Sequence, residues 1–415
     1  MTNDVLAALP FYRFSDARHQ LKEVLNPTNL IYSDFFSELI DAAIYLKPEN
    51  LQRTGSYKVR GAYYKISNLS KEQKKRGLIA ASAGNHAQGV AFAARALGVK
   101  ATIVMPVNTP LLKINKTRKL GAEVVLSGEV FDEAAAKALE LAELHDYTYI
   151  PPFDDLDVIV GQGTIAFELL DELPEVDVIL VPIGGGGLAS GVARLAKLLK
   201  PSVKVIGVEP SGAASMKLSL EKGTVQSLPK VQTIADGVAV KTPGKLTYAV
   251  VSQCIDEIIT VDDVNLIDSF LSMVEQHKLV CENAGLITVA ALFKLKEQLK
   301  GKNVISIISG GNIDVLTINS LVQRGLYMRD RVFTFSADIS DKPGELEHIT
   351  GLIAREKGNI IRLEHDQFSI LERFSEVSVT ITIETYGSEH KAQIIQVLKD
   401  EGYRISLVER HYKES

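Results

Sequence analysis

The stretch VDVILVPIGGGGLASGVARLAKLLK, residues 176–200, joins an apolar run to an amphipathic run through four consecutive glycines. An apolar run that does not alternate, followed by a helical pattern, is typical of a βα unit in a sheet buried on both faces. Similar pairs recur from about residue 30 to residue 327, with apolar runs such as GLIAAS, KATIVMP, KVIGVEP and NVISIISG. The sequence therefore predicts an α/β fold with open, mostly parallel sheets.

The order of predicted helices and strands changes near residue 330. Residues 332–409 read as strand, helix, strand, strand, helix and strand. This βαββαβ order is the pattern of a small ferredoxin-like domain. Because a chain of 415 residues exceeds the size at which one core keeps growing, we predict a larger domain over residues 1–327 and a smaller one over residues 328–415.

Composition limits the classes of function. The formal net charge is −5, and the sequence has neither a basic stripe nor a nucleic-acid-binding motif, so we expect no nucleic acid partner. No apolar run approaches the length of a membrane span, and the N-terminus lacks the features of a signal peptide. Cys254 and Cys281 form no CxxC pair, which fits a reducing compartment. We therefore expect a cytoplasmic protein without membrane contact.

The glycine run is the first candidate binding site. Backbone N–H groups at a helix N-terminus attract anions, and glycines let a phosphate approach them, so we expect Gly184–Gly187 to hold a phosphate. A tight turn without a ligand is the alternative. The spacing of Gly184, Gly186 and Ala189 also fits GxGxxG/A. With Glu209 at the interval of a ribose-binding acid, a nicotinamide dinucleotide is a second candidate ligand.

Three further motifs are weak signals separately but indicate one binding site together. ASAGNHAQG, residues 81–89, ends a strand with small residues ahead of a helix, which forms a nest for a carboxylate. SIISGGN, residues 306–312, ends another strand with Ser309 and two glycines, and RTGSYKVRGAYY, residues 53–64, contains Lys58 between glycines. A phosphate loop, polar groups for a ring and a lysine together indicate pyridoxal 5'-phosphate, whose aldehyde forms a Schiff base with lysine.

These motifs carry a family resemblance. Six segments follow one another along the chain: TGSYKVRGA, ASAGNHAQGVAFAARALGVKATIVMP, GGGGLASG, ADGVAVKTPG, CENAG and SGGN. With them, the chain from about residue 10 to residue 325 resembles the threonine dehydratases, pyridoxal phosphate enzymes of the tryptophan-synthase-β type. The C-terminal part resembles ACT domains, amino-acid-sensing modules of βαββαβ form, through ISDKPGEL and REKGNI.

The resemblance implies a fold and a set of residue roles. A fold type II enzyme has two catalytic subdomains, here the smaller over 53–152 inserted into the larger over 1–52 and 153–327, with the regulatory domain over 328–415. Lys58 is expected to hold the cofactor covalently and, once freed by the substrate amine, to remove the α-proton. The cofactor is expected to contact Asn85, Ser309 and the backbone N–H groups of Gly184, Gly185, Gly186, Gly187 and Leu188. The substrate carboxylate is expected to bind Ser82, Gly84, Asn85 and His86.

Some of these roles have a chemical reason. The hydroxyl of Ser309 cannot hold the pyridine nitrogen protonated as a carboxylate does, so elimination of a β-hydroxyl is favoured over transamination. For His86 a structural role is preferred to that of a general base, because the sequence places no acid or thiol partner beside it. Arg60 is assigned to structure, in an ion pair near the site.

Two positions depart from relatives within the family. Ala83 stands where serine racemases have a second serine that acts as a base, so we expect no racemase activity. Ser215 stands where those relatives have an aspartate that binds a divalent ion together with a glutamate at the position of Glu209, so no metal is expected. Gly237 resembles a family glycine beside the cofactor ring, and Glu282 resembles a family glutamate near it.

The resemblance implies deamination of L-threonine to 2-oxobutyrate and ammonia, with conversion of L-serine to pyruvate as a side activity. We expect the first step of isoleucine biosynthesis, with L-isoleucine as the allosteric effector and a homotetramer as the assembly. A catabolic threonine/serine dehydratase, a nicotinamide-dependent oxidoreductase and a non-enzymatic, amino-acid-responsive regulator are the alternatives.

Overall fold

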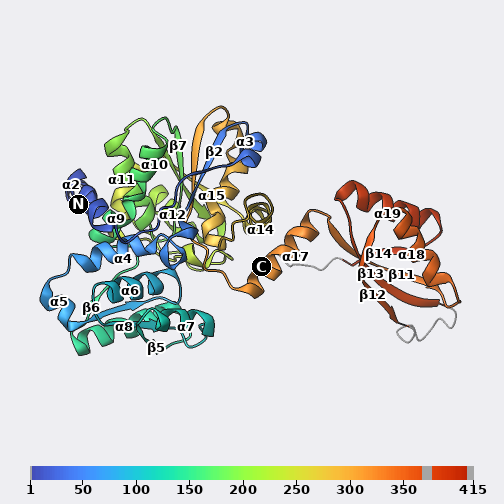
Figure 1. Cartoon of the computed structure of the whole chain (residues 1–415), viewed down its shortest axis with the longest axis horizontal. Coiled ribbons are helices and arrows are strands. Elements are labelled where there is room, and N and C mark those ends of the chain that lie inside the picture. Colours follow the sequence, from blue (N-terminus) through green and yellow to red (C-terminus); the bar gives the residue numbers. More distant parts are fainter. Residues whose placement is uncertain (1, 367–375, 409–415) are drawn as a thin grey trace. The chain divides into compact units, whose positions relative to one another are not determined.

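The computed structural model describes residues 2–366 and 376–408 and divides into two compact units, Met1–Asp314 and Val315–Ser415 (Figure 1). The sequence placed the domain boundary after residue 327, whereas the structure assigns helix α17 (Val315–Met328) to the second unit. Within the described residues, no helix combines the length and the apolar character needed to cross a bilayer.

The first unit contains a six-stranded sheet in the order β1-β2-β10-β7-β8-β9. Its strands are β1 (Ile31–Tyr32), β2 (Ala43–Pro48), β7 (Val178–Pro182), β8 (Lys204–Pro210), β9 (Glu257–Val261) and β10 (Asn303–Ile308). Only β1 and β2 pair antiparallel; the other pairs are parallel. Every residue of β7 is buried, which explains why this strand reads as an apolar run without alternation.

A second, four-stranded sheet is fully parallel, in the order β5-β4-β3-β6. Its strands are β3 (Leu78–Ala81), β4 (Ala101–Met105), β5 (Glu123–Leu126) and β6 (Thr148–Tyr149). All four lie between β2 and β7 along the chain, so the small sheet forms a lobe inserted into the large one; it is the lower, cyan part of this unit in Figure 1.

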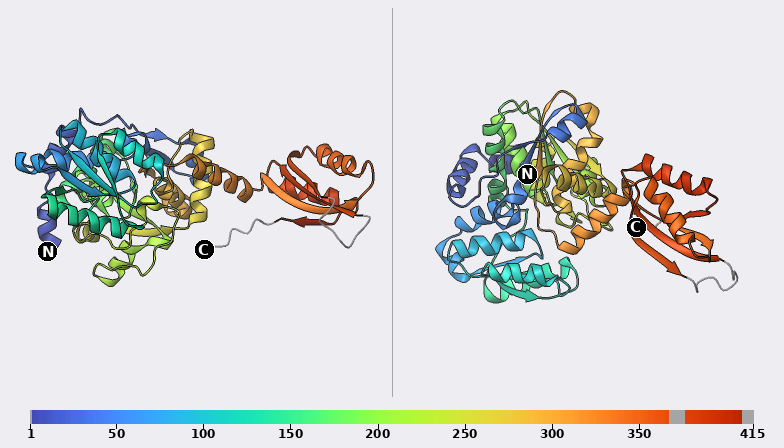
Figure 2. Two further views of the ribbon diagram at one scale, coloured as in Figure 1. Left: turned by 90° about the horizontal axis from the view of Figure 1, so that it is seen from below. Right: turned by 45° about the vertical axis from the view of Figure 1, so that its right-hand side comes forward.

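Helices cover both sheets of this unit (Figure 2). Helix α15 packs on β7, β8, β9 and β10, and α11 packs on β7. The helices of the large lobe are α1 (Thr2–Ala7), α2 (Phe11–Leu21), α3 (Asp34–Ile40), α9 (Leu156–Gly163), α10 (Ile165–Glu172), α11 (Gly187–Leu199), α12 (Ser215–Lys222), α13 (Lys245–Cys254), α14 (Asp263–Ser272), α15 (Asn283–Lys294) and α16 (Lys296–Leu299). Those of the small lobe are α4 (Lys58–Ser67), α5 (Lys71–Arg76), α6 (Asn85–Ala96), α7 (Leu111–Lys119) and α8 (Phe131–His145).

The loops singled out in the sequence follow the carboxyl ends of parallel strands. The loop of residues 82–84 follows β3, the glycine run follows β7, and Ser309–Asn312 follows β10. Ligands of open α/β sheets bind beyond these strand ends. The fold therefore supplies one place at which the three loops can act together.

The second unit begins with α17 and continues as β11 (Val332–Ser340), α18 (Glu345–Arg355), β12 (Asn359–Asp366), β13 (Glu376–Glu384), α19 (Ser388–Asp400) and β14 (Ile405–Leu407). Its strands form an antiparallel sheet in the order β12-β13-β11-β14. Helices α18 and α19 lie side by side on this sheet (Figure 1). The predicted βαββαβ order is confirmed. Residues 367, 368, 374 and 375 of the predicted middle strands, and residue 409 of the last one, lie outside the described residues.

Candidate active site

Lys58 is the first residue of α4, at a point where several chain segments meet. Its Nζ donates a hydrogen bond of 2.9 Å to the backbone oxygen of Pro152. The N–H of the preceding Tyr57 donates to the backbone oxygen of Ser309 at 3.2 Å. Helix α6 packs so closely on this turn that a Cβ added to Gly89 would lie 3.1 Å from the carbonyl carbon of Lys58. The lysine thus lies against the end of β10, the start of the large lobe after β6, and α6.

The surroundings of Lys58 change its acidity. Burial lowers the pKa of its amine from 10.5 to about 8, while the negative charge of Glu282 acts in the opposite direction. The same Nζ lies 5.3 Å from the centre of the Tyr57 ring. An amine with this pKa is partly neutral near physiological pH, so it can act as a nucleophile and as a base.

The glycine run Gly184–Gly187 connects β7 to α11. A Cβ on Gly185 would lie 2.3 Å from the Phe153 ring, and Gly186 has a φ of +94°, which favours glycine. The loop is held in place by Thr247, whose Oγ1 donates a 2.6 Å hydrogen bond to the backbone oxygen of Gly185. The first N–H groups of a helix have no partner within it, so this tightly packed loop leaves backbone donors for an anion.

The loop between β3 and α6 adds a second set of donors. The N–H of Gly84 donates to Ser82 Oγ at 3.1 Å, and a Cβ added to Gly84 would have no atom within 4 Å, so space adjoins the loop at this point. Asn85 Nδ2 donates to Glu282 Oε1 at 2.5 Å, and Asn85 Oδ1 accepts from Asn312 Nδ2 at 2.7 Å. Three loops from different parts of the chain are thereby joined at Asn85.

His86 follows directly but is buried. Its Nε2 lies 2.9 Å from the backbone oxygen of Ile150. Because a carbonyl only accepts, the hydrogen of the neutral ring belongs on Nε2. Burial, together with the positive charge of Lys58, lowers the pKa of His86 to about 3. A neutral imidazole that donates to the backbone fits a structural role better than that of a base.

Glu282 lies just before α15, beneath two glycines. A Cβ on Gly310 would lie 2.3 Å from Glu282 Oε1, and one on Gly237 would lie 3.7 Å from the same atom. Burial raises the pKa of the carboxyl to about 7, although the hydrogen bond from Asn85 opposes this. Beside it, Ser309 is almost fully buried and its Oγ donates to the backbone oxygen of Ala284 at 3.3 Å. This contact is long, and the hydroxyl can turn its single hydrogen from the Ala284 oxygen to an acceptor on a ligand.

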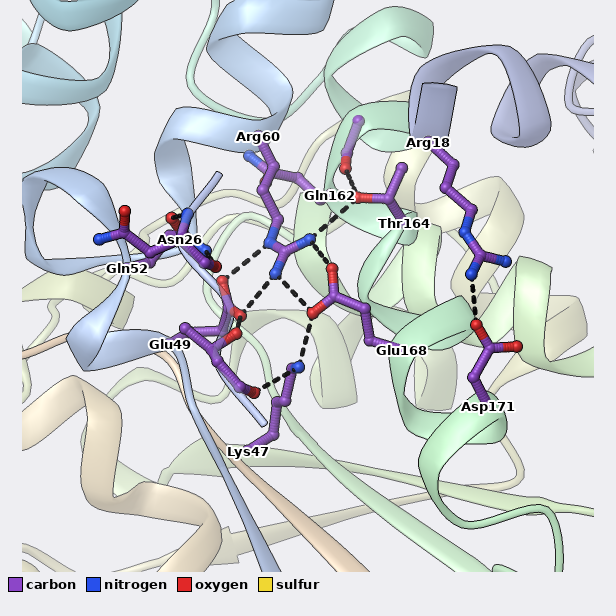
Figure 3. A network of polar contacts seen from close by, with 12 residues as sticks. Arg18, Asn26, Lys47, Glu49, Gln52, Arg60, Gln162, Thr164, Glu168 and Asp171 are labelled. Atoms are coloured by element: carbon purple, nitrogen blue, oxygen red, sulfur yellow. Dashed lines mark hydrogen bonds and ion pairs between the residues drawn. The ribbon is translucent and has the colours of Figure 1, made fainter. Parts of the chain in front are cut away.

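A buried group of charges surrounds Arg60, which lies on α4 two residues after Lys58 (Figure 3). Arg60 donates to Glu49 at 2.7 and 2.8 Å and to Glu168 at 2.6 and 2.9 Å. Lys47 Nζ donates to Glu168 at 2.6 Å, and the side chains of Lys47, Glu49 and Arg60 are wholly buried. Burial would raise the pKa of Glu168, but Arg60 and Lys47 lower it to about 2. We refer to Lys47, Glu49, Arg60 and Glu168 as the charge cluster.

A family model described as pyridoxal-phosphate dependent enzyme matches residues 21–310. The chain belongs to this family. The L-threonine ammonia-lyase of Thermotoga maritima is 44% identical to it, over 95% of this chain and 98% of the relative. The catabolic L-threonine dehydratase of Escherichia coli K12 is 40% identical, over 74% of this chain and 94% of the relative. Among solved structures, the processed form of threonine deaminase isoform 2 from Solanum lycopersicum has a TM-score of 0.73 and 41% identity, covering 76% of this chain and 92% of that chain.

These findings confirm the predicted fold class and the predicted cofactor, pyridoxal phosphate. The residues present fit this cofactor as a pyridoxal phosphate enzyme requires. A lysine amine of lowered pKa is available for the covalent link, and the cradle of packed glycines ahead of α11 suits its phosphate. The nicotinamide alternative is wrong, and its expected acid has another role: Glu209 accepts hydrogen bonds from the N–H groups of Met216 and Lys217 at 2.9 and 2.8 Å.

Glu209 gives a prediction about pH. Burial raises its pKa from 4.5 to about 7. Between these pH values the folded state keeps a proton that the unfolded state releases, so stability falls as pH rises from about 4.5 through 7. A shift of this size corresponds to about 3 kcal/mol. We expect the free energy of urea unfolding of the apoprotein to fall from pH 5 to pH 8, and to fall less in Glu209→Gln. Equal decreases in both proteins would contradict this.

Sequence reasoning missed the segment PPFDD after β6 and the part played by Asn312. Pro152 and Phe153 contact Lys58 and Gly185 as described above, and both Oδ atoms of Asp154 accept N–H groups at the start of α13, with Leu246 N at 2.8 Å. In the sequence Asn312 is only the last residue of the SGGN motif, and no role is predicted for it. The signal for PPFDD was its place after the short strand β6, which ends at the same edge of the small sheet as β3.

Proposed function

We propose that the protein is a threonine ammonia-lyase that converts L-threonine to 2-oxobutyrate and ammonia, with L-serine a poorer substrate that yields pyruvate. The observation that carries the proposal is Lys58, an amine whose pKa is lowered to about 8, placed among the loops that follow β3 and β10. The identity to a protein named L-threonine ammonia-lyase, which extends over 95% of the chain, supports the choice of substrate.

The cofactor contacts come from three loops. The N–H groups of Gly184–Gly187 and Leu188 bind the phosphate at the N-terminus of α11, which spans 13 residues. Asn85 would donate to the ring oxygen, and Ser309 would face the ring nitrogen. Gly237, whose Cβ would meet Ala284 at 2.9 Å, leaves room beside the ring. When bound, pyridoxal phosphate supplies the electron sink that acidifies the α-carbon of the amino acid.

Lys58 has two tasks. It would hold the cofactor covalently, and as a neutral amine its Nζ would take the α-proton of the substrate. The Pro152 oxygen, 2.9 Å from Nζ in this structure, would accept a hydrogen bond from the charged amine. Ser82, Gly84 and Asn85 bind the substrate carboxylate at the start of α6, and the neighbouring His86 stays neutral and fixes the loop to Ile150.

The second unit is the basis of a regulatory role. Its βαββαβ order resembles that of ACT domains, and we infer that it binds L-isoleucine as an inhibitor. The catabolic relative matches over 94% of its own length but only 74% of this chain, which leaves it no counterpart of comparable size to this unit. The biosynthetic role at the start of isoleucine synthesis is therefore favoured over the catabolic one. We further propose that the protein is cytoplasmic and forms a homotetramer. Coupling of this kind usually passes through subunit contacts.

The deciding experiment is the rate of 2-oxobutyrate release from L-threonine by the purified holoenzyme, titrated with L-isoleucine. We expect release, and inhibition as isoleucine rises; light scattering should give a tetramer. Release that ignores isoleucine would support the lyase and sink the regulatory proposal, leaving the catabolic role. No release by protein that shows the visible cofactor band would sink the threonine assignment.

A further inference from the structure

The amide of Asn85 lies in the middle of a chain of polar contacts that joins three loops. On one side Asn85 Nδ2 donates to Glu282 Oε1 at 2.5 Å. On the other side Asn85 Oδ1 accepts from Asn312 Nδ2 at 2.7 Å. Asn312 Nδ2 also donates to the backbone oxygen of Thr54 at 2.7 Å. This series of hydrogen bonds therefore runs from the turn ahead of Lys58, through Asn312 and Asn85, to the buried carboxyl of Glu282.

The chemistry of these groups fixes the orientation of the Asn85 amide. The Thr54 oxygen can only accept, so the Asn312 atom that faces it must be the nitrogen. The same nitrogen faces Asn85, so Asn85 must turn its oxygen towards Asn312 and its nitrogen towards Glu282. A flipped Asn85 would place two N–H groups against each other at Asn312, and an oxygen against Glu282 whenever that carboxyl is ionised.

The backbone is shaped for these contacts. Thr54 has a φ of +65°, an uncommon conformation for a β-branched residue, and it directs its carbonyl at Asn312. A Cβ on Gly55 would lie 2.8 Å from Asn312 Oδ1, and one on Gly310 would lie 3.1 Å from Asn85 Nδ2. Glycine at both positions leaves room for the polar chain. Backbone strain of this kind persists only where the surrounding structure fixes it.

We propose that Asn312 is a positioning residue that orients Asn85, so that one N–H of Asn85 Nδ2 is held by Glu282 and the other is presented to the cofactor's ring oxygen. This inference rests on the proposed function. An amide nitrogen has two hydrogens, and the contact with Glu282 uses one of them. Without Asn312, the amide can turn over and present its oxygen to the ring oxygen instead, where two acceptors repel.

The readout is the visible band of the cofactor bound at Lys58, followed as a function of pH in the holoenzyme. A donor to the ring oxygen stabilises the more negative, high-pH form. We therefore expect Asn312→Ala and the isosteric Asn312→Asp to raise the pH midpoint of the band by about one unit and to weaken pyridoxal phosphate binding about tenfold. A purely structural loss would lower the melting temperature without moving the midpoint.

Two comparisons make the test specific. Asn50→Ala is the matched control, because Asn50 Nδ2 also donates to a backbone oxygen, that of Val280 at 3.2 Å, and Asn50 lies against Gly311. We expect no shift of the midpoint in this variant. In an Asn85→Ala background, Asn312→Ala should add no further shift, because Asn312 acts only through Asn85.

The proposal is overturned by an unchanged midpoint in both Asn312 variants, by an equal shift in Asn50→Ala, or by a full additional shift in the Asn85→Ala background. Asn312→Asp keeps the test open if the alanine variant does not fold. Failure of the proposed function looks different: the unmodified protein would then show no visible band, or a band without release of 2-oxobutyrate.

Discussion

Lys58→Ala is expected to remove the visible cofactor band and to lower the rate of 2-oxobutyrate release by about four orders of magnitude. The rate falls because the variant loses both the covalent link to the cofactor and the positioned base. The absorption spectrum of the purified protein with added pyridoxal phosphate, and a single-turnover measurement with L-threonine, check the two effects separately.

Lys65→Ala is the matched control, because Lys65 lies on the same helix and makes ion pairs with Asp155 and Asp157 at 2.7 and 3.3 Å. We expect this variant to keep the band and most of the activity. If Lys58→Ala retained turnover while losing the band, another group would be the base. If it retained both, the assignment of Lys58 would be wrong.

Arg60→Ala is expected to lower the free energy of unfolding of the apoprotein by about 3–5 kcal/mol, because it removes the cation that compensates the negative charges of Glu49 and Glu168. Both partners are affected: Glu49 is wholly buried and accepts two hydrogen bonds from Arg60, and Glu168 keeps only Lys47. The urea unfolding transition of the first unit measures this loss of stability.

Two further variants isolate the cause. Arg76→Ala removes an exposed pair with Asp146, whose side chains are 42% and 75% exposed, and should change stability by less than about 0.5 kcal/mol. Glu49→Gln in the Arg60→Ala background removes the unpaired charge and should recover part of the loss. If Glu49→Gln instead deepened the loss, the unpaired charge of Glu49 would not be the cause.

Local patterns were enough to predict much of this fold. The run through β7 is apolar without alternation because every residue of the strand is buried, and the βαββαβ unit alternates visibly between strand and helix. Lys58 and the glycine run could be singled out because each lies in a short motif whose neighbouring residues indicate its chemistry. Such features depend on residues that are close together in the sequence, so local patterns and hydrophobic periodicity predict them directly.

The polar contacts around Asn85 could not be predicted in the same way. Asn85 follows β3 in the small sheet, Asn312 follows β10 in the large sheet, and Glu282 precedes α15, so no local pattern specifies that they meet. The charge cluster is similar, since Glu168 reaches Arg60 from a helix 108 residues away. A lone Asn or Glu is compatible with many surroundings, so its partner becomes visible only when strand order is known.

Strand order also has a consequence for synthesis of the protein. Strand β10 pairs with β2 on one side and β7 on the other, yet it ends at Ile308 while β2 ends at Pro48. At ribosomal rates of about 5–20 residues per second, tens of seconds pass before β2 meets its parallel neighbour. During that time all four strands of the inserted small lobe are already made and can pair with one another. The nascent chain therefore holds the unpaired edge of β2 until β10 leaves the ribosome, and this edge is the natural place for a chaperone to act.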